Sequence, residues 1–135
     1  MNWKTIAFFV FSLVLLGVLG VYTQHQLAIH DGLYKEYYFT GELRSEVEYK
    51  AGRPHGVAKI YFKNGVMKRI ANFRDGMQEG ETKNYYENGV LMSEEVYESS
   101  MLIGIAKYYT ADGKIQWEAE YQKGRIIPGT RKVYQ

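Results

Sequence analysis

The chain repeats itself with a period of 24 residues, and this period restricts the fold more than any other feature of the sequence. Two glycine columns, two aromatic columns and one lysine column follow it: Gly32/Gly56/Gly80/Gly104, Gly41/Gly65/Gly89/Gly113, Tyr37/Tyr61/Tyr85/Tyr109, Tyr49/Phe73/Tyr97/Tyr121 and Lys35/Lys59/Lys83/Lys107. A partial fifth copy begins at Gly129, and a one-residue insertion near Pro128 precedes its Lys132 and Tyr134. So short a unit cannot bury an apolar face alone, so neighbouring copies must stack.

A turn signal lies at the centre of every repeat. The central pairs are Thr40-Gly41, Asn64-Gly65, Asn88-Gly89 and Asp112-Gly113. Asn-Gly and Asp-Gly favour a two-residue type I′ turn, in which both central residues need a positive φ. Each repeat is therefore predicted to be a β-hairpin with Gly41, Gly65, Gly89 and Gly113 as its structural turn residues. A longer link, such as residues 52–56, is expected between one hairpin and the next.

This turn position sets a register between the two strands of each hairpin. It predicts three Lys–Glu pairs facing each other across the strands: Lys35–Glu46, Lys83–Glu94 and Lys107–Glu118. The second repeat breaks the pattern, because Lys59 faces Ile70. Facing opposite charges are favourable, so they support the register.

The same register sorts the side chains onto two faces of a sheet. The apolar face is predicted to carry Tyr34, Tyr38, Leu43, Val47, Tyr49, Ala58, Ile60, Phe62, Met67, Ala71, Phe73, Tyr86, Leu91, Tyr97, Ala106, Tyr108, Ile115, Trp117, Ala119 and Tyr121, with Thr82, Asn84 and Glu95 among them. The mixed face carries the Lys and Glu columns and Tyr37, Tyr61, Tyr85, Tyr109 and Tyr134. The predicted fold is all-β, a single-layer antiparallel meander of about nine strands.

An apolar segment precedes the repeats. Residues 6–22 carry no charge and follow a single cation, Lys4. Their length fits the lower end of a membrane-spanning helix, and residues 18–20 also offer a signal-peptide cleavage site. We therefore divide the chain into a signal peptide or membrane anchor at 1–22, a linker at 23–31, and a repeat domain at 32–135. The repeat units are 32–55, 56–79, 80–103, 104–128 and the partial unit 129–135.

The charge distribution predicts the orientation of this segment. The amino terminus and Lys4 precede it, whereas the next lysine is Lys35. The positive-inside rule then leaves the amino terminus in the cytoplasm. The repeat domain is expected outside the cytoplasm on the cytoplasmic (inner) membrane, or secreted or periplasmic if the segment is cleaved.

Composition and motifs argue against several kinds of site. The chain has no Cys, so it has neither disulfides nor a thiolate metal site. Its net charge of +2 is not clustered as nucleic-acid binding requires. His25 and His30 lie in the linker, and His55 is interpreted as a turn residue. No catalytic signature, metal site or cofactor site is identified in the sequence, and enzymatic activity is the least favoured hypothesis.

The repeat resembles the MORN-repeat family, and more specifically its bacterial variant. The resemblance runs from Gly32 to about Tyr134 and includes GLYKEYYFTGELRSEVEYKAGRPHG in the first unit and GETKNYYENGVLMSEEVYESS in the third. Ser100 departs from the glycine at Gly52, Gly76 and Gly124, and Thr110 departs from an aromatic column. The resemblance implies a single-layer sheet of stacked hairpins. It also implies a binding role, such as an antitoxin or immunity protein, or a membrane-attached scaffold.

Two functions fit these features. The first is a module that binds a protein partner, such as a cognate toxin. The second is an envelope scaffold that acts through self-association or membrane contact. The mixed-face tyrosines Tyr37, Tyr61, Tyr85, Tyr109 and Tyr134 are the predicted binding surface, because tyrosine is enriched at protein interfaces. The apolar face is the predicted surface for self-association or for burial by curling.

Overall fold

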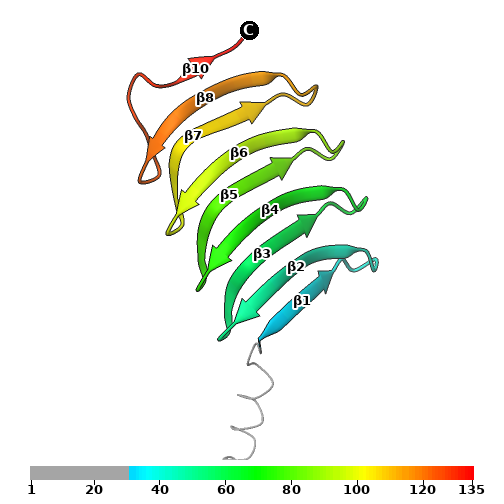
Figure 1. Ribbon diagram of the computed structural model, residues 1–135. Coiled ribbons are helices and arrows are strands. Elements are labelled where there is room, and N and C mark those ends of the chain that lie inside the picture. The colour runs from blue at the N-terminus through cyan, green and yellow to red at the C-terminus, as the bar shows by residue number, and fades with distance from the viewer. Residues whose placement is uncertain (1–30) are drawn as a thin grey trace, which may run out of the picture.

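A computed structural model describes residues 31–135, which form one open antiparallel sheet (Figure 1). Its strands are β1 (Gly32–Tyr37), β2 (Leu43–Lys50), β3 (Arg53–Tyr61), β4 (Met67–Arg74), β5 (Met77–Tyr85), β6 (Leu91–Glu98), β7 (Met101–Tyr109), β8 (Ile115–Gln122), β9 (Arg125–Ile126) and β10 (Lys132–Val133). The predicted helix over 1–22, His25 and His30 lie outside the described residues. Within residues 31–135, no helix is long and apolar enough to cross a membrane.

The strands follow one another in chain order from β1 to β8, which confirms the all-β meander. Eight strands are long, and two strands of two residues each follow them: β9 lies at the end of the fourth unit, and β10 lies in the partial fifth copy. Both short strands pair with the free edge of β8: Ile126 faces Tyr121, and Lys132 faces Glu118. The extra residue near Pro128 therefore interrupts the last strand, while Lys132 still takes the place that the repeat predicts for it.

The predicted type I′ turn at the polar-Gly pairs is wrong. Among the central residues only the glycines have a positive φ, for example 84° at Gly89, whereas Asn88 does not. The Tyr86 N–H donates to the Val90 carbonyl at 2.8 Å, and the Gly89 N–H donates to the Tyr86 carbonyl at 2.9 Å. These bonds close a three-residue loop, a tight turn followed by one left-handed glycine.

Asparagine has a different role in this loop from the predicted one. The Asn88 side-chain oxygen accepts a hydrogen bond from the Val90 N–H at 3.0 Å. The side-chain nitrogen of Asn88 donates to the carbonyl of Ala111 in the next loop, also at 3.0 Å. Asn64 makes the same pair of bonds to its own loop and to the loop that follows. The asparagines therefore stack successive loops along one side of the sheet.

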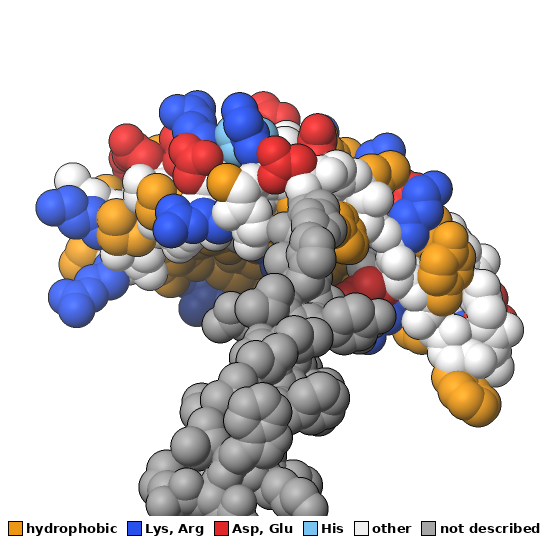
Figure 2. Space-filling view, turned by 90° about the horizontal axis from the view of Figure 1, so that it is seen from below, with side chains coloured by type: hydrophobic (Ala, Val, Ile, Leu, Met, Phe, Trp, Pro, Cys, Tyr) orange, Lys and Arg blue, Asp and Glu red, His pale blue; other side chains and the backbone are white. Residues whose placement is uncertain are grey.

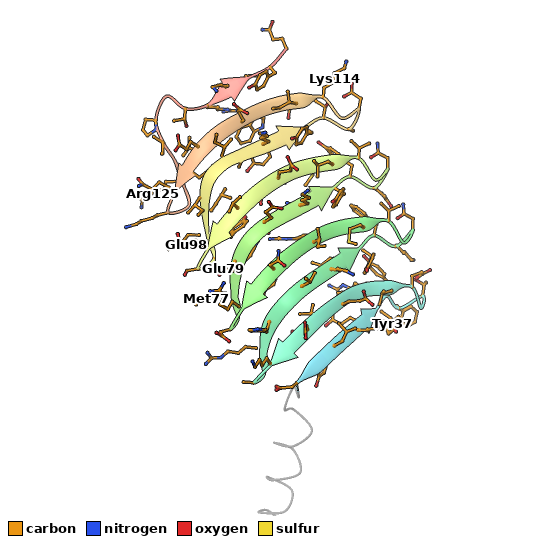
Figure 3. All side chains as sticks on the ribbon, in the orientation of Figure 1. Tyr37, Met77, Glu79, Glu98, Lys114 and Arg125 are labelled. Atoms are coloured by element: carbon orange, nitrogen blue, oxygen red, sulfur yellow. The ribbon has the colours of Figure 1, made fainter. Side chains whose placement is uncertain are left out.

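The type I′ turns lie between the hairpins, where a longer link was expected. Ala51 and Gly52 both have a positive φ, of 50° and 70°. Lys50 faces Arg53 directly, so the link is a two-residue turn and β3 starts at once. Figure 3 shows the two kinds of connection on opposite sides of the sheet: Lys114 lies beside the three-residue loops, and Met77, Glu98 and Arg125 lie beside the two-residue turns.

The predicted Lys–Glu register is confirmed, although a different loop produces it. Lys35 faces Glu46, Lys83 faces Glu94, and Lys107 faces Glu118. The three-residue loop shifts the pairing by one residue. A bulge at the start of each second strand shifts it back, so that Tyr37 faces Leu43 while Glu36 faces Ser45.

This bulge changes the face assignment of one column. Directly facing residues lie on the same face of a sheet. Leu43, Met67, Leu91 and Ile115 face the mixed-face tyrosines Tyr37, Tyr61, Tyr85 and Tyr109. Their predicted place on the apolar face is therefore wrong, because the alternation was counted without the bulge.

The sheet is arched, and its apolar face lines the inner side. Figure 2 shows Lys, Arg, Asp and Glu side chains over the convex surface and hydrophobic side chains in the hollow beneath it. The most buried side chains of the inner face are small: Ser45, Ala58, Ala71, Thr82, Ser93, Ala106 and Ala119. Small residues leave room for larger neighbours on the inside of a curved surface. The core of this single layer is therefore a strip of small buried side chains along the concave face, which we call the valley.

Candidate functional site

The mixed face carries one row of facing residues across the convex side of the sheet, and every residue of the row except Ile70 is charged. In spatial order, the row reads Lys35, Glu46, Lys59, Ile70, Lys83, Glu94, Lys107, Glu118 and Lys132. We call this row the charge ladder. The predicted binding tyrosines lie beside it, one in each repeat.

The tyrosine hydroxyls are engaged by the ladder. Tyr61 donates a hydrogen bond to Glu46 at 3.0 Å, and Tyr109 donates one to Glu94 at 2.9 Å. Tyr134 hydrogen-bonds to Glu118. Burial, followed by the hydrogen bond to the carboxylate, raises the pKa of both Tyr61 and Tyr109. These three phenols therefore stay protonated and hold the ladder glutamates in place.

Lysines hold the same carboxylates from the other side. The Nζ of Lys35 lies 2.9 Å from Glu46, and that of Lys132 lies 3.1 Å from Glu118. The hydrogen bond from the lysine is the main cause that lowers the pKa of each glutamate. The Glu46 and Glu118 side chains are only 17% and 13% exposed, so each carboxylate is well enclosed by its Lys and Tyr.

Tyr37 and Tyr85 differ from the other three tyrosines. Tyr37 is 58% exposed at the edge strand β1. Tyr85 occupies the position of Tyr61 and Tyr109 one repeat away, but the ladder residue at its carboxylate position is Ile70. Both Tyr37 and Tyr85 also border the inner hollow. The structure therefore brings three of the five predicted tyrosines into equivalent sites and separates the other two.

The concave side of the sheet holds an open hollow of about 1000 Å³ near the three-residue loops. We call it the concave hollow. It is lined by Tyr37, Tyr38, Phe39, Arg44, Ile60, Phe62, Lys68, Arg69, Asn84, Tyr85, Tyr86, Glu87 and Met92. Three cations and one carboxylate lie among these aromatic and aliphatic groups. The hollow therefore combines apolar area with positive charge.

Two of these cations were missed by the sequence analysis. Arg44 and Lys68 lie at the bulges that start the second strands, where strict alternation would put them on the mixed face. Lys68 instead lies with its Nζ 5.5 Å from the centre of the Phe62 ring. The signal that could have revealed them is the column Arg44, Lys68, Met92 and Gln116, three residues after each loop glycine.

Tyrosines at the edge of the hollow connect one repeat to the next. The Tyr38 hydroxyl donates to the Tyr61 carbonyl at 2.8 Å, and the Tyr86 hydroxyl donates to the Tyr109 carbonyl at 2.7 Å. Phe62 takes the intervening place and has no hydroxyl. Because Tyr38 and Tyr86 are held at both ends, the aromatic lining of the hollow is preorganised.

A polar network continues along the valley from the hollow. Arg69 donates to Gln78 at 3.0 Å, and Gln78 donates to Thr82 at 2.6 Å. A second chain of bonds joins Asn84, Ser93, Glu95 and Tyr97. Burial, followed by the hydrogen bond to Glu95, raises the pKa of Tyr97. The third repeat therefore places satisfied polar groups, Thr82 and Glu95, where the second and fourth repeats have alanine.

An aromatic stack ends the concave face at the last complete repeat. The rings of Tyr108 and Trp117 stack with centroids 3.8 Å apart, and Arg131 lies 4.8 Å above the Trp117 ring. Burial raises the pKa of Tyr108, and a hydrogen bond with Tyr121 adds to the shift. This stack packs the partial fifth copy against the fourth repeat.

The described residues contain no group of three or more His, Cys, Asp or Glu side chains arranged to hold a metal. His55 lies beside a two-residue turn, with its Nδ1 3.5 Å from both the backbone nitrogen and a carboxylate oxygen of Asp75. Glu79 and Asp31 accept hydrogen bonds from the corresponding turns. His55 therefore occupies a turn-capping position.

The family comparison agrees with this architecture. The profile of the MORN repeat variant family matches residues 31–51, 54–75, 78–99 and 102–123, one match for each hairpin. The chain belongs to the MORN repeat variant family. MORN repeats are a non-catalytic module that binds proteins or membranes, and this chain is a binding repeat module at that level of description.

Other comparisons add little to the MORN assignment. No curated protein matches the chain. A solved structure of accessory secretory protein 1, 2 and 3 in Streptococcus pneumoniae is similar to it with a TM-score of 0.40 and 15% identity. The similarity covers 77% of this chain but only 20% of that one, and it carries no conclusion about function.

Proposed function

We propose that the repeat domain binds a segment of a protein partner in its concave hollow and catalyses no reaction. The observation that carries this proposal is the joint presence of Tyr38, Phe62 and Tyr86 with Arg44 and Lys68 around one open hollow. Aromatic residues and arginine are the side chains most enriched at protein interfaces. Because the aromatic groups are already held in place, binding would cost little side-chain entropy.

The test is affinity capture with the tagged full chain from solubilised membranes, repeated with two double variants. Phe62→Ala with Arg44→Ala removes an aromatic and a cation from the hollow. Tyr61→Ala with Tyr109→Ala removes two tyrosines from the convex face, away from the hollow. We expect the first variant to lose the captured partner and the second to retain it, with both remaining folded by circular dichroism. The opposite result would favour the mixed-face tyrosines as the binding surface.

A narrower form of this proposal is that the partner is a toxin and the chain is its antitoxin or immunity protein. Its support is the resemblance to bacterial MORN-variant proteins. Co-expression provides the test: a toxin captured in stoichiometric amount should be neutralised by the full chain and not by the hollow double variant. Capture of a harmless protein would refute the toxin reading while leaving the binding module intact.

A second candidate, an envelope scaffold, is favoured by the open edge of the sheet. All six residues of β1 are exposed, including Leu33 at 58%. Within residues 31–135 β1 pairs only with β2, and an edge strand of this kind can pair with a strand of another chain. Analytical ultracentrifugation of the full chain in detergent would detect this self-association. A concentration-independent monomer would argue against the scaffold.

We further propose that the repeats lie outside the cytoplasm, through the apolar segment at 6–22 acting as an anchor or signal peptide. The charge asymmetry around that segment supports this orientation. A reporter that is active only outside the cytoplasm, fused after Gln135, should be active. Activity of a cytoplasm-only reporter at the same position would refute the orientation.

A further inference from the structure

The charge ladder contains a repeated carboxylate site. In the first hairpin Glu46 lies between Lys35 and Lys59 and accepts a hydrogen bond from Tyr61. Two hairpins later Glu94 lies between Lys83 and Lys107 and accepts one from Tyr109. At the end of the sheet Glu118 lies between Lys107 and Lys132, with Tyr134 as its phenol. Three equivalent positions on the convex face therefore each hold a carboxylate between two lysines, beside one tyrosine.

The second hairpin has the lysines and the tyrosine of this site but not the carboxylate. Ile70 faces Lys59 on β3 and Lys83 on β5. Tyr85 lies 15 residues beyond Ile70, as Tyr61 lies beyond Glu46 and Tyr109 beyond Glu94. Ile70 is partly exposed and offers no hydrogen-bond acceptor. The ladder therefore has five lysines and only three glutamates, and its missing acid lies at this one position.

We propose that Lys59, Lys83 and Tyr85 form a binding site for a carboxylate that an acidic protein segment supplies over Ile70. The bound carboxylate lies between the two lysines and accepts the Tyr85 hydroxyl, as the ladder glutamates do in the other hairpins. Glu46 already has Lys35 and Tyr61, and Glu94 already has Tyr109. The Nζ of Lys83 lies 3.6 Å from Glu94, so an incoming carboxylate would share Lys83 with Glu94, much as Lys107 faces both Glu94 and Glu118.

A protein carboxylate is the occupant that the ladder itself indicates. In the other hairpins the group between the two lysines is a glutamate carboxylate at the position of Ile70, and the partly exposed Ile70 offers apolar surface to the carbon atoms of an incoming acidic side chain. This inference goes beyond the function proposed above, because Lys59, Ile70 and Lys83 lie on the convex face and do not line the concave hollow. Tyr85 alone borders both sites, and the hollow double variant Phe62→Ala with Arg44→Ala leaves Tyr85 in place.

The test measures binding of a fluorescein-labelled oligoglutamate peptide to the purified full chain in non-ionic detergent, by fluorescence anisotropy. Ile70→Glu supplies the missing acid from the chain itself. It should fill the site, keep the fold, and weaken peptide binding about tenfold, as expected for loss of two exposed ion pairs and one hydrogen bond. Added salt should weaken wild-type binding as well. Lys59→Gln with Lys83→Gln should give the same tenfold loss, should Ile70→Glu not fold.

Ile105→Glu is the matched control. Ile105 lies on the same convex face two residues from Lys107 and is 55% exposed, and this substitution makes the same change of charge. It should leave peptide affinity within about twofold, since diffuse charge is screened by salt. Equal losses in Ile70→Glu and Ile105→Glu would overturn the proposal, as would equal affinity of wild type and Ile70→Glu. Binding of anionic phospholipid vesicles that depends on Ile70, with no binding of oligoglutamate, would also overturn it, because the ligand would then be a phosphate.

Discussion

Replacement of Gly89 by valine tests the loop geometry of the repeat. Gly89 has a φ of 84°, in the left-handed region. A Cβ at this position would lie 3.8 Å from the nearest atom, a methyl carbon of Val66, which is an ordinary contact. The cost of valine therefore comes from the backbone. A left-handed conformation costs an L-residue about 1–2 kcal/mol, and a β-branched residue lies at the upper end.

The assay is thermal unfolding of the full chain, compared with Lys83→Ala. A loss of about 2 kcal/mol lowers the Tm of a domain of this size by roughly 10 °C. The Nζ of Lys83 lies 3.6 Å from Glu94, and the two side chains are 41% and 37% exposed. Such a pair contributes about 0–1 kcal/mol, so Lys83→Ala should lower the Tm by only a few degrees.

Gly89→Asn separates backbone strain from loss of space. Asparagine tolerates the left-handed region better than any β-branched residue, although it also fills space beyond Cβ. It should recover about 1 kcal/mol of the loss caused by valine. Equal destabilisation by asparagine and valine would show that crowding and not φ controls this position. Equal Tm shifts for Gly89→Val and Lys83→Ala would contradict the loop itself.

Two further predictions concern a turn and the ladder. Ser100 has a φ of 65°, and its hydroxyl accepts a hydrogen bond from the Gln78 N–H at 3.0 Å. Ser100→Ala removes this bond and should lower the unfolding free energy by about 1 kcal/mol. Ser100→Gly removes the same bond but also relieves backbone strain of similar size, so it should change the unfolding free energy little. Equal losses in denaturant titrations would refute the strain. Lys35 and Lys132 lower the pKa of Glu46 and Glu118 below the ordinary value of 4.5, so their contribution is present above pH 4.5 and is lost as the pH falls through the lowered values. Denaturation at a series of pH values should show this decrease, and Lys35→Met should make it smaller; an unchanged pH dependence in Lys35→Met would contradict the assignment.

The repeat period and the facing charges were enough to predict the fold. Columns of glycine and tyrosine at one spacing predict stacked hairpins. In the structure each of Lys35, Lys83 and Lys107 faces the glutamate that was predicted for it. The turn type was not predictable in the same way. Asn-Gly suits a two-residue type I′ turn, and it equally suits the end of a three-residue loop. The two alternatives give the same Lys–Glu register once the bulge restores it, so the register could not distinguish them.

The concave hollow could not be predicted because it depends on the bulges. An alternating pattern assigns each residue to a face only while the alternation is unbroken, and one extra residue reverses it. Arg44 and Lys68 enter the hollow for this reason, and Leu43 and Met67 leave the apolar face. The curvature of the sheet likewise cannot be predicted from the pattern of polar and apolar residues. Its signature in the structure is the set of small buried side chains on the concave face, such as Ala71 and Thr82.

Departures from the repeat carry more information about function than the repeat does. A residue present in every copy, such as the loop glycine, is explained by a need that every copy shares, and that need is the fold. Ile70 in place of a glutamate and Arg69 in place of a small or apolar residue satisfy no such shared need. Both lie in the second hairpin, on opposite faces of β4 and adjacent in the chain. Arg69 lines the concave hollow, and Ile70 replaces the ladder glutamate on the convex face, so the two departures serve the two proposed sites separately. Arg69→Ala should therefore leave binding of the oligoglutamate peptide unchanged, and an equal loss of peptide binding in Arg69→Ala and Ile70→Glu would refute this separation.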